Sequence, residues 1–189
     1  MKLKNKYYIL RHGEALSNVM KVSSSWPEKF KNPLTKHGKE VIMAVAEILK
    51  DKRIDDIFTS DLLRTKQTAE IVGKELNIRA KFDKRLREID FGNMNGRPAK
   101  DLDVAFKKES LRISRAMPRG ENYQEVVKRG FAFLKDMEKR FTGKNILIVS
   151  HESLLWMLEA KVHGISLSKA LKLIPREQRI HKGQMKELN

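Results

Sequence analysis

The stretch NILIVS, residues 145–150, is the most apolar strand candidate in this chain of 189 residues. A strand that is buried on both faces of a sheet has a continuous apolar sequence, so we expect this one at the centre of a mostly parallel sheet. His151 follows it directly, and a second apolar run, residues 7–10, is followed by Arg11 and His12. In an open α/β sheet the carboxyl ends of the strands form the ligand-binding crevice. The sequence therefore predicts two histidines and an arginine at such an edge, an arrangement suited to chemistry on an anion.

Strand and helix patterns alternate along the rest of the chain. Apolar residues, Ile42 and Ile48 among them, recur at helical spacing after the capping residue Thr35, and Asn122 with Glu125 forms a second capping pair. This alternation favours a three-layer α/β/α sandwich with a mostly parallel central sheet. The expected strands are 7–10, 54–60, 79–82, 145–150 and 184–188, and the expected helices are 35–49, 61–76, 122–141 and 154–162. No linker interrupts them, so we expect a single domain over residues 1–189, with a short cap or insertion around 97–117.

The composition excludes several classes of protein. There is no cysteine, which rules out disulfides, thiolate metal sites and a cysteine nucleophile. The first apolar run is too short for a signal peptide, and no run approaches the length of a membrane span, so we expect a cytoplasmic protein without a membrane partner. The oligomeric state has no signature in the sequence.

The chain is strongly basic, with 40 Lys and Arg against 24 Asp and Glu and a formal net charge of +16. No basic block is interleaved with aromatic residues, so solvated helix faces explain the charge better than a nucleic-acid partner does. A basic surface also steers phosphorylated small molecules toward a site. We therefore expect a phosphorylated small-molecule substrate rather than nucleic acid.

Four short segments carry the residue types needed for phosphate chemistry, and one of them is Ser150-His151 at the end of the central strand. Arg11 offers a planar fork for phosphate oxygens, and a neutral ring nitrogen of His12 is able to attack phosphorus. Asn18 follows about one turn later and adds an amide donor. Arg64 lies in the first turn of a predicted helix, where free N–H groups favour an anion. Glu88, beside a glycine-bearing bend, is able to donate a proton if burial raises its pKa.

The Arg11-His12-Gly13 triplet alone does not outweigh an ordinary structural role, and for the Arg64 segment alone that role is the better interpretation. The ordered set, however, resembles the histidine phosphatase superfamily, also called the phosphoglycerate mutase-like family. The similarity runs from Leu10 to about Leu158, nearly the whole chain. It rests on Arg11-His12-Gly13-Glu14 with Asn18, Leu34-Thr35 with Gly38, Ser60-Asp61-Leu62 with Arg64, Gln67-Thr68-Ala69, Glu88 with Phe91-Gly92 and Gly96, Pro118 with Gly120-Glu121, and Val149-Ser150-His151.

The resemblance implies a fold of the phosphoglycerate mutase type and a role for each residue. His12 is implied as the nucleophile that becomes phosphohistidine, and Glu88 as the group that protonates the leaving oxygen and then activates water. Arg11, Arg64 and His151 are implied to surround the transferring phosphoryl group, with Asn18 as a further donor. Phosphoryl transfer needs mainly positioning and positive charge, which arginine and histidine supply here, so the resemblance implies neither a metal nor a cofactor.

The chain departs from the family pattern directly after the second histidine. Family members usually have a small residue there, whereas this chain has Glu152. A carboxylate in a phosphate pocket repels the substrate unless it points away or pairs with a basic residue. Its charge also suits the N-terminus of the helix that follows.

Hydrolysis is favoured over a mutase reaction because the segment 97–117 is short and should admit water. Arg112 and Arg115 lie in this segment, but not in the pattern that mutases of the family use to bind a carboxylate. Three alternatives stay open: a phosphoglycerate mutase, an inactive binding or regulatory member of the fold, and a metal-dependent hydrolase. Arg11 argues against the last, because an arginine beside a ligand repels a cation.

Overall fold

Five strands form one sheet in the order β3-β2-β4-β1-β5 in the computed structural model of the protein, which describes residues 2–189. All neighbours are parallel except β1 and β5, which are antiparallel. The predicted fold class, α/β with a mostly parallel central sheet, is confirmed. The strands are β1 (Lys6–Arg11), β2 (Asp56–Thr59), β3 (Lys81–Phe82), β4 (Asn145–Ser150) and β5 (Met185–Glu187).

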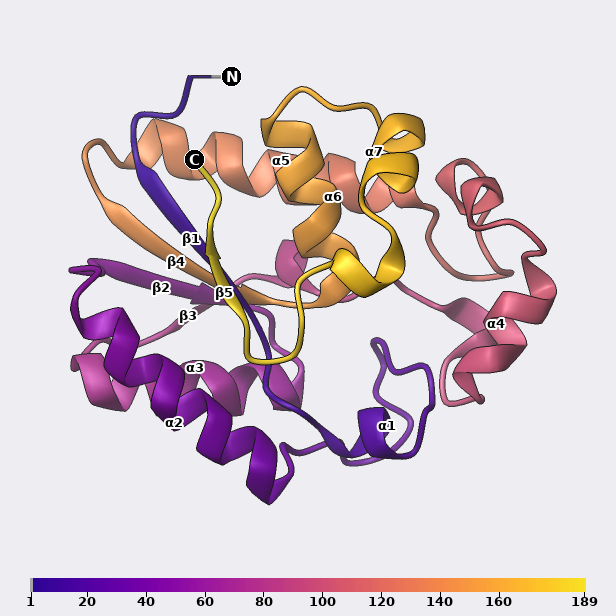
Figure 1. The fold of residues 1–189 in the computed structure, drawn as a ribbon, viewed down its shortest axis with the longest axis horizontal. Coiled ribbons are helices and arrows are strands. Elements are labelled where there is room, and N and C mark those ends of the chain that lie inside the picture. The colour runs from indigo at the N-terminus through magenta and orange to yellow at the C-terminus, as the bar shows by residue number, and fades with distance from the viewer. Residues whose placement is uncertain (1) are drawn as a thin grey trace.

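The most apolar strand, β4, is the middle strand, as its sequence predicts. Ile146 to Val149 are completely buried, because helices cover both faces of the sheet. In the register of β4, Arg11 of β1 lies beside Ser150, and Thr59 of β2 lies beside Val149. The residues that follow these three strands therefore emerge together at one edge of the sheet (Figure 1).

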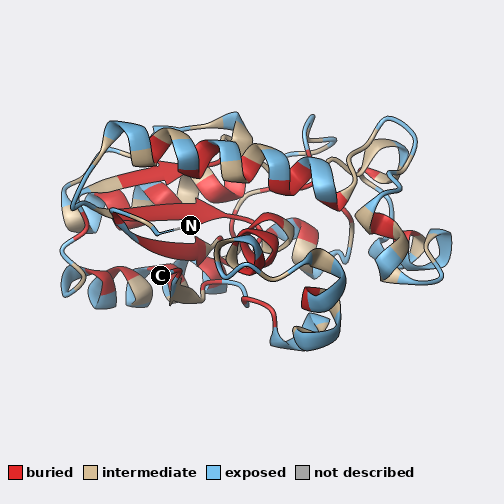
Figure 2. Cartoon of the chain, turned by 90° about the horizontal axis from the view of Figure 1, so that it is seen from above, coloured by how far each residue is buried: buried red, intermediate tan, exposed pale blue. Residues whose placement is uncertain are grey.

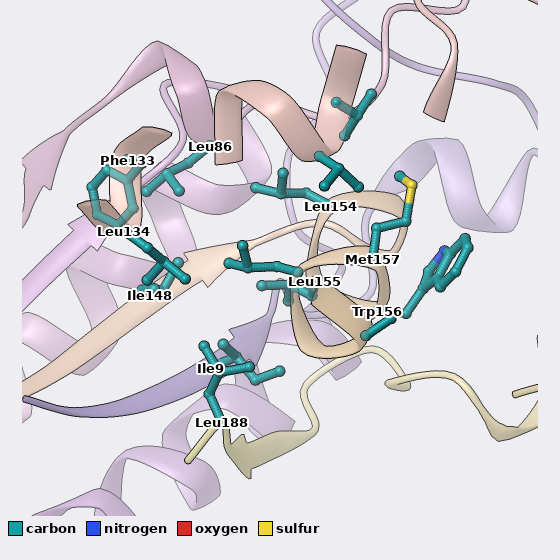
Figure 3. Packing of buried hydrophobic residues seen from close by; sticks show 14 of the residues in the cluster. Ile9, Leu86, Phe133, Leu134, Ile148, Leu154, Leu155, Trp156, Met157 and Leu188 are labelled. Carbon is teal, nitrogen blue, oxygen red and sulfur yellow. The ribbon is translucent and has the colours of Figure 1, made fainter. Parts of the chain in front are cut away.

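Side chains alternate between the two faces of the sheet and form two separate cores. Ile9 and Ile148 point into the core beneath α5 (Tyr123–Arg140) and α6 (Glu152–Val162). Leu10 and Val149 point into the core beneath α2 (Lys36–Lys50) and α3 (Leu63–Leu76). Figure 2 shows the buried strands between helices whose outer faces are exposed. Figure 3 shows the first core, in which Leu155 of α6 lies close to Ile148 of β4.

The helices are α1 (Leu16–Val19), α2 (Lys36–Lys50), α3 (Leu63–Leu76), α4 (Ala99–Ala105), α5 (Tyr123–Arg140), α6 (Glu152–Val162) and α7 (Leu167–Leu173), with 3-10 turns η1 (Lys84–Leu86), η2 (Gly92–Met94), η3 (Glu109–Ile113) and η4 (Arg176–Gln178).

The helix ends follow the predicted caps. The Thr35 side chain accepts a hydrogen bond from the backbone N–H of Gly38 and starts α2. Asn122 and Glu125 form the reciprocal capping box that starts α5. The helix after His151 begins at Glu152, two residues earlier than predicted, and so places a carboxylate in its first turn.

Several boundaries differ from the prediction. Strand β2 begins at Asp56 rather than at residue 54, and Ile48 lies on the solvent side of α2 with 54% of its surface exposed. The segment 97–117 folds into α4 and η3, which lie beyond the end of the sheet (Figure 1). Neither α1 nor α7 was expected. Within residues 2–189, no helix has the length and apolarity that crossing a bilayer requires.

Candidate active site

The pairing of β1 with β4 brings His12 and His151 together. The backbone N–H of His12 donates to the carbonyl of Ser150 at 3.1 Å, which continues the parallel ladder by one residue. The two imidazole rings have centroids 5.2 Å apart and meet edge to face. The sequence prediction that both histidines lie at one sheet edge is met by this geometry.

Arg64 bridges the two rings from the first turn of α3. Its Nε donates to Nε2 of His12 and its Nη2 to Nδ1 of His151, both at 3.1 Å. Its guanidinium also donates to the carbonyl of Ser24 at 3.0 Å. Only 2% of the Arg64 surface is exposed, and burial lowers its pKa to about 10, so it stays charged at neutral pH.

These contacts define the protonation state of both histidines. Arginine only donates, so each ring nitrogen that faces Arg64 must be an acceptor. The other nitrogen of His12, Nδ1, lies 2.8 Å from the carbonyl of Gly13 and must donate to it. In His151 the remaining nitrogen, Nε2, carries the proton and lies 3.0 Å from the Ser60 hydroxyl. Both rings are therefore neutral, each with a fixed tautomer.

Burial maintains this neutral state. The pKa of His12 and that of His151 lie well below the usual value, first because both rings are desolvated and then because Arg64 repels an added proton. The Nε2 atom of His12 therefore stays unprotonated at and below neutral pH, with its lone pair accepting from Nε of Arg64. A solvated histidine would be protonated in part of that range.

Glu88 lies in the loop after η1 and lines the same cavity as His12. Its Oε1 atom accepts from the backbone N–H of Ile89 at 2.9 Å. Burial raises the pKa of Glu88 above the usual value, although the nearby Arg64 charge opposes the change. Glu88 thus retains a proton to higher pH than a solvated glutamate, which suits a proton donor.

Arg11 ends β1, and its guanidinium forms an ion pair with Glu152. The Nη1 group of Arg11 lies 2.6 Å from Oε2 of Glu152 and donates to the carbonyl of Ile180 at 2.9 Å. Of the two ways in which Glu152 was expected to avoid repelling phosphate, the structure has the pairing with a basic residue. Glu152 also occupies the first position of α6, so its charge suits the helix end as well.

The cavity in front of His12 has a volume of about 240 Å³. Asn18 lines it, and because its Oδ1 atom accepts from the backbone N–H of Ala15 at 2.9 Å, its Nδ2 group stays available as a donor. His151 does not line the cavity, since it is completely buried and contacts Arg64. The predicted site residues that line it are Arg11, His12, Asn18, Arg64 and Glu88.

Three further arginines line the cavity: Arg112, Arg176 and Arg179. From the sequence alone, Arg112 was given no role and the other two were missed. Arg179 is only 4% exposed and binds Glu109 of η3 through two hydrogen bonds of 2.8 and 3.0 Å. Arg176 and Arg179 come from the segment before β5. That segment has no motif, but β5 runs antiparallel to β1, so the residues before β5 meet the site at the end of β1.

Arg112 is the arginine of the cap segment, residues 97–117, that lines the cavity. It is 8% exposed, and its guanidinium lies 4.7 Å from the centre of the Tyr123 ring. Among residues 2–189, no carboxylate forms an ion pair with it, in contrast to Arg11 and Arg179. The cap segment thus adds an uncompensated positive charge to the cavity.

A resident metal would need several histidine, cysteine or carboxylate ligands in one place. Within the part of the chain that the structure describes, no group of three or more such side chains has that arrangement. His12 and His151 both present their free nitrogens to Arg64, a cation. The residues at this site therefore fit an anion.

Comparisons with known proteins agree with this description. The family model described as "Histidine phosphatase superfamily (branch 1)" matches residues 7–182. A Salmonella arizonae protein named "Probable phosphoglycerate mutase GpmB" is 31% identical over 163 residues, which cover 84% of this chain and 74% of that protein.

Solved structures share the fold over nearly the whole chain. YhfR of Bacillus stearothermophilus has a TM-score of 0.83 and 26% identity, with 96% of this chain and 89% of that one covered. The alpha-ribazole phosphatase from Shigella flexneri has a TM-score of 0.78 and 26% identity, with coverage of 95% and 88%. A mycobacterial glucosyl-3-phosphoglycerate phosphatase, at 22% identity and a TM-score of 0.81 over 97% of this chain and 89% of that one, shares the fold.

Proposed function

The chain belongs to the histidine phosphatase superfamily and is an enzyme, and from this premise we propose that it hydrolyses phosphomonoesters through a phosphohistidine on His12. The observation that carries the proposal is that Arg64, which lines the cavity together with His12, bridges two neutral, buried histidines. It supplies a nucleophile and a fixed positive charge at the same place.

In the first step, Nε of Arg64 turns from Nε2 of His12 to a phosphoryl oxygen of the substrate, and the freed Nε2 lone pair attacks the phosphorus atom. The bond from phosphorus to the leaving oxygen breaks, and Glu88 gives that oxygen its proton. Arg11, Arg64 and Asn18 donate to the phosphoryl oxygens, whose charge spreads in the transition state. His151 contributes by accepting from Nη2 of Arg64, which holds that guanidinium in place.

In the second step, the Glu88 carboxylate accepts a proton from water as the water oxygen attacks the phosphohistidine. The phosphorus–nitrogen bond breaks, His12 regains its neutral ring, and inorganic phosphate is released. The proton that Glu88 gave to the first product is thereby replaced, so the cycle balances.

The test is turnover of p-nitrophenyl phosphate by a His12→Ala variant. Because the nucleophile is removed, we expect a loss of at least about a thousandfold in kcat. His37→Ala, at an exposed position of α2, is the matched control and should retain normal activity. Brief reaction of the wild type with 32P-labelled substrate should leave a label that is stable in base and lost in acid, as expected for phosphohistidine.

Near-normal turnover by His12→Ala would refute the mechanism. Activity that EDTA abolishes and zinc restores would establish the metal-dependent alternative instead. If the wild type binds inorganic phosphate but turns over no phosphomonoester in a broad panel, the protein is an inactive binding member of the fold.

A phosphoglycerate mutase is the second candidate. The similarity to the Salmonella protein and the uncompensated charge of Arg112 in the cavity both favour a substrate with a carboxylate beside its phosphate. Hydrolysis stays the first choice because only the short elements α4 and η3 form the cap segment, which leaves water a route to His12. Incubation with 3-phosphoglycerate separates the two, since a mutase yields the 2-isomer and a phosphatase yields glycerate and inorganic phosphate.

The proposal also covers the domain organisation, the location of the enzyme and its class of substrate. We propose one domain over residues 1–189, because strands from both ends of the chain lie side by side in the sheet, with the segment 97–117 as its cap. We further propose that the enzyme works in the cytoplasm, without metal or cofactor, on phosphorylated small molecules rather than nucleic acid. The net charge of +16 supports an anionic substrate.

A further inference from the structure

Glu152 is one of three carboxylates that line the cavity, the other two being Glu88, the proposed proton donor, and Asp103, which forms an ion pair with Arg176. It lines the cavity together with Arg11 and His12, and 23% of its side chain is exposed. Its Oε2 atom lies 2.6 Å from Nη1 of Arg11, the shortest distance that joins a cavity-lining arginine to a carboxylate. Glu152 is therefore placed to act on the phosphate site rather than on bulk solvent.

Two protein oxygens lie next to the Arg11 Nη1 group, at 2.6 Å in an ion pair and at 2.9 Å as a hydrogen-bond acceptor. One oxygen is the carboxylate of Glu152 and the other is the carbonyl of Ile180. The Nε group of Arg11 is buried and has no partner among the described residues. Glu152 and the Ile180 carbonyl thus determine which way the guanidinium faces and leave the Nη2 group to bind an oxyanion.

Arg179 is a second basic residue close to the Glu152 carboxylate. Nη1 of Arg179 lies 3.9 Å from Oε1 of Glu152 and 2.8 Å from Oε1 of Glu109. The Tyr123 hydroxyl donates to the same Glu109 oxygen at 2.6 Å. The Glu152 carboxylate is therefore supported by a buried arginine that the cap segment orients.

We propose that Glu152 is a positioning residue that holds Arg11 and offsets its charge, so that the pocket binds inorganic phosphate less tightly and the product leaves readily. The inference rests on the proposed phosphatase function and deepens it. A pocket with several donors around a dianion retains its product unless a nearby negative charge weakens the attraction.

Two substitutions separate the charge of Glu152 from its position. Glu152→Gln keeps a polar oxygen beside Nη1 of Arg11 but removes the negative charge, whereas Glu152→Ala removes both. Glu159→Gln makes the same change of charge on the same helix, outside the cavity, where Glu159 lies 3.8 Å from Lys186. Calorimetry with inorganic phosphate gives the dissociation constant without turnover, and steady-state kinetics with p-nitrophenyl phosphate gives kcat and KM.

For Glu152→Gln we expect inorganic phosphate to bind about five- to tenfold more tightly, with KM lowered in parallel and kcat within about threefold of the wild type. For Glu152→Ala we expect kcat at least about tenfold below that of the Gln variant, because Arg11 is no longer held. Glu159→Gln should match the wild type.

Two results would overturn the inference. One is an unchanged phosphate dissociation constant in Glu152→Gln, and the other is equal kcat in the Gln and Ala variants. Because phosphate binding is measured without catalysis, the inference is tested even if His12 proves not to be the nucleophile, which the His12→Ala experiment decides separately.

Discussion

Arg64 is the residue on which the site depends, since its guanidinium fixes the tautomer of one histidine through Nε and of the other through Nη2. A lysine could not replace it, because a single ammonium group on a flexible stem does not present a planar fork. The resemblance of the ordered motifs to the histidine phosphatase superfamily was what implied that Arg11, His12, Arg64 and Glu88 act as one group. The Arg11–Glu152 ion pair could only be stated as one of several possibilities, because its geometry depends on how α6 starts.

We expect the loss of kcat/KM on replacing Glu88 to be larger for substrates whose leaving group needs a proton. Glu88→Gln should lower kcat/KM for an alkyl phosphate such as glycerol 3-phosphate by about a hundredfold or more. The loss should be far smaller for p-nitrophenyl phosphate, because nitrophenolate leaves without protonation. Steady-state kinetics with both substrates measures the difference.

The raised pKa of Glu88 also sets the direction of the pH dependence. The protonated form is the donor, so wild-type kcat/KM for glycerol 3-phosphate should fall as the pH rises through that pKa. The Gln variant should lack this fall. Equal losses for the two substrates, with the alkaline fall intact, would contradict the role of Glu88 as proton donor.

At the scale of elements, the positions of strands and capped helices follow from local sequence, whereas their ends depend on tertiary contacts. Thr35 and Asn122 cap helices as predicted, because capping is a local interaction. Ile48 fits the helical spacing and yet faces solvent, because the buried side of α2 is centred on Ile42, Ala46 and Leu49. Helix α1 has only four residues and carries no periodic signal.

The loop that carries His12 is fitted tightly against the first turn of α2. A Cβ atom at Gly38 would collide with the carbonyl oxygen of Glu14 and lie 2.8 Å from its backbone nitrogen. A Cβ atom at Gly130, within α5, would lie 2.6 Å from the end of the Leu154 side chain, which is free to rotate away. Gly38 and Gly130 are therefore a matched pair of helical positions for substitution by alanine, one against rigid backbone and one against a side chain that is free to move.

We expect Gly38→Ala to lower the free energy of unfolding by roughly 2 to 3 kcal/mol and to reduce activity, because the backbone beside His12 must move. Gly130→Ala should cost less than about 1 kcal/mol, since alanine favours the helix and offsets the side-chain shift. Urea unfolding and p-nitrophenyl phosphate turnover provide the two measurements. Similar losses of unfolding free energy at both positions would show that the Glu14 backbone can move to accept a Cβ atom at residue 38.

At the scale of the whole molecule, the continuous apolar sequence of β4 and the alternation of elements were sufficient to predict the layers and the central strand. The segment before β5 could not be placed in the same way. Arg176 and Arg179 reach the cavity only because β5 pairs antiparallel with β1, and a three-residue strand gives no sign of its direction. The cavity wall therefore depends on long-range pairing that local patterns do not encode.

Burial of two neutral histidines makes the stability of the whole fold sensitive to acid. Their pKa values are depressed in the folded state, so below about pH 6.5 the unfolded chain binds more protons at these positions. Stability is thus fully present above that pH and is lost as the pH falls, with a slope approaching about 1.4 kcal/mol per pH unit for each histidine. The pKa of Glu88 is raised in the folded state, so the folded protein takes up one proton there as the pH falls. This uptake offsets part of the loss of stability.

The check is urea unfolding at pH 7.5, 6.5 and 5.5. His151→Asn should reduce the slope by up to about 1.4 kcal/mol per pH unit, and the exposed His37→Asn should leave it unchanged. A slope that is the same in all three proteins would mean that His151 is protonated in the folded state.

The strand order has a consequence for how the protein is made. The neighbours of β1 in the sheet are β4 and β5, both from the last third of the chain, so during synthesis β1 leaves the ribosome long before either partner exists. Its apolar residues, Tyr7 to Leu10, then present two unpaired edges, the kind of template on which nascent chains aggregate. His12 is translated long before Arg176 and Arg179, so its pocket is complete only after the segment that precedes β5 has been added.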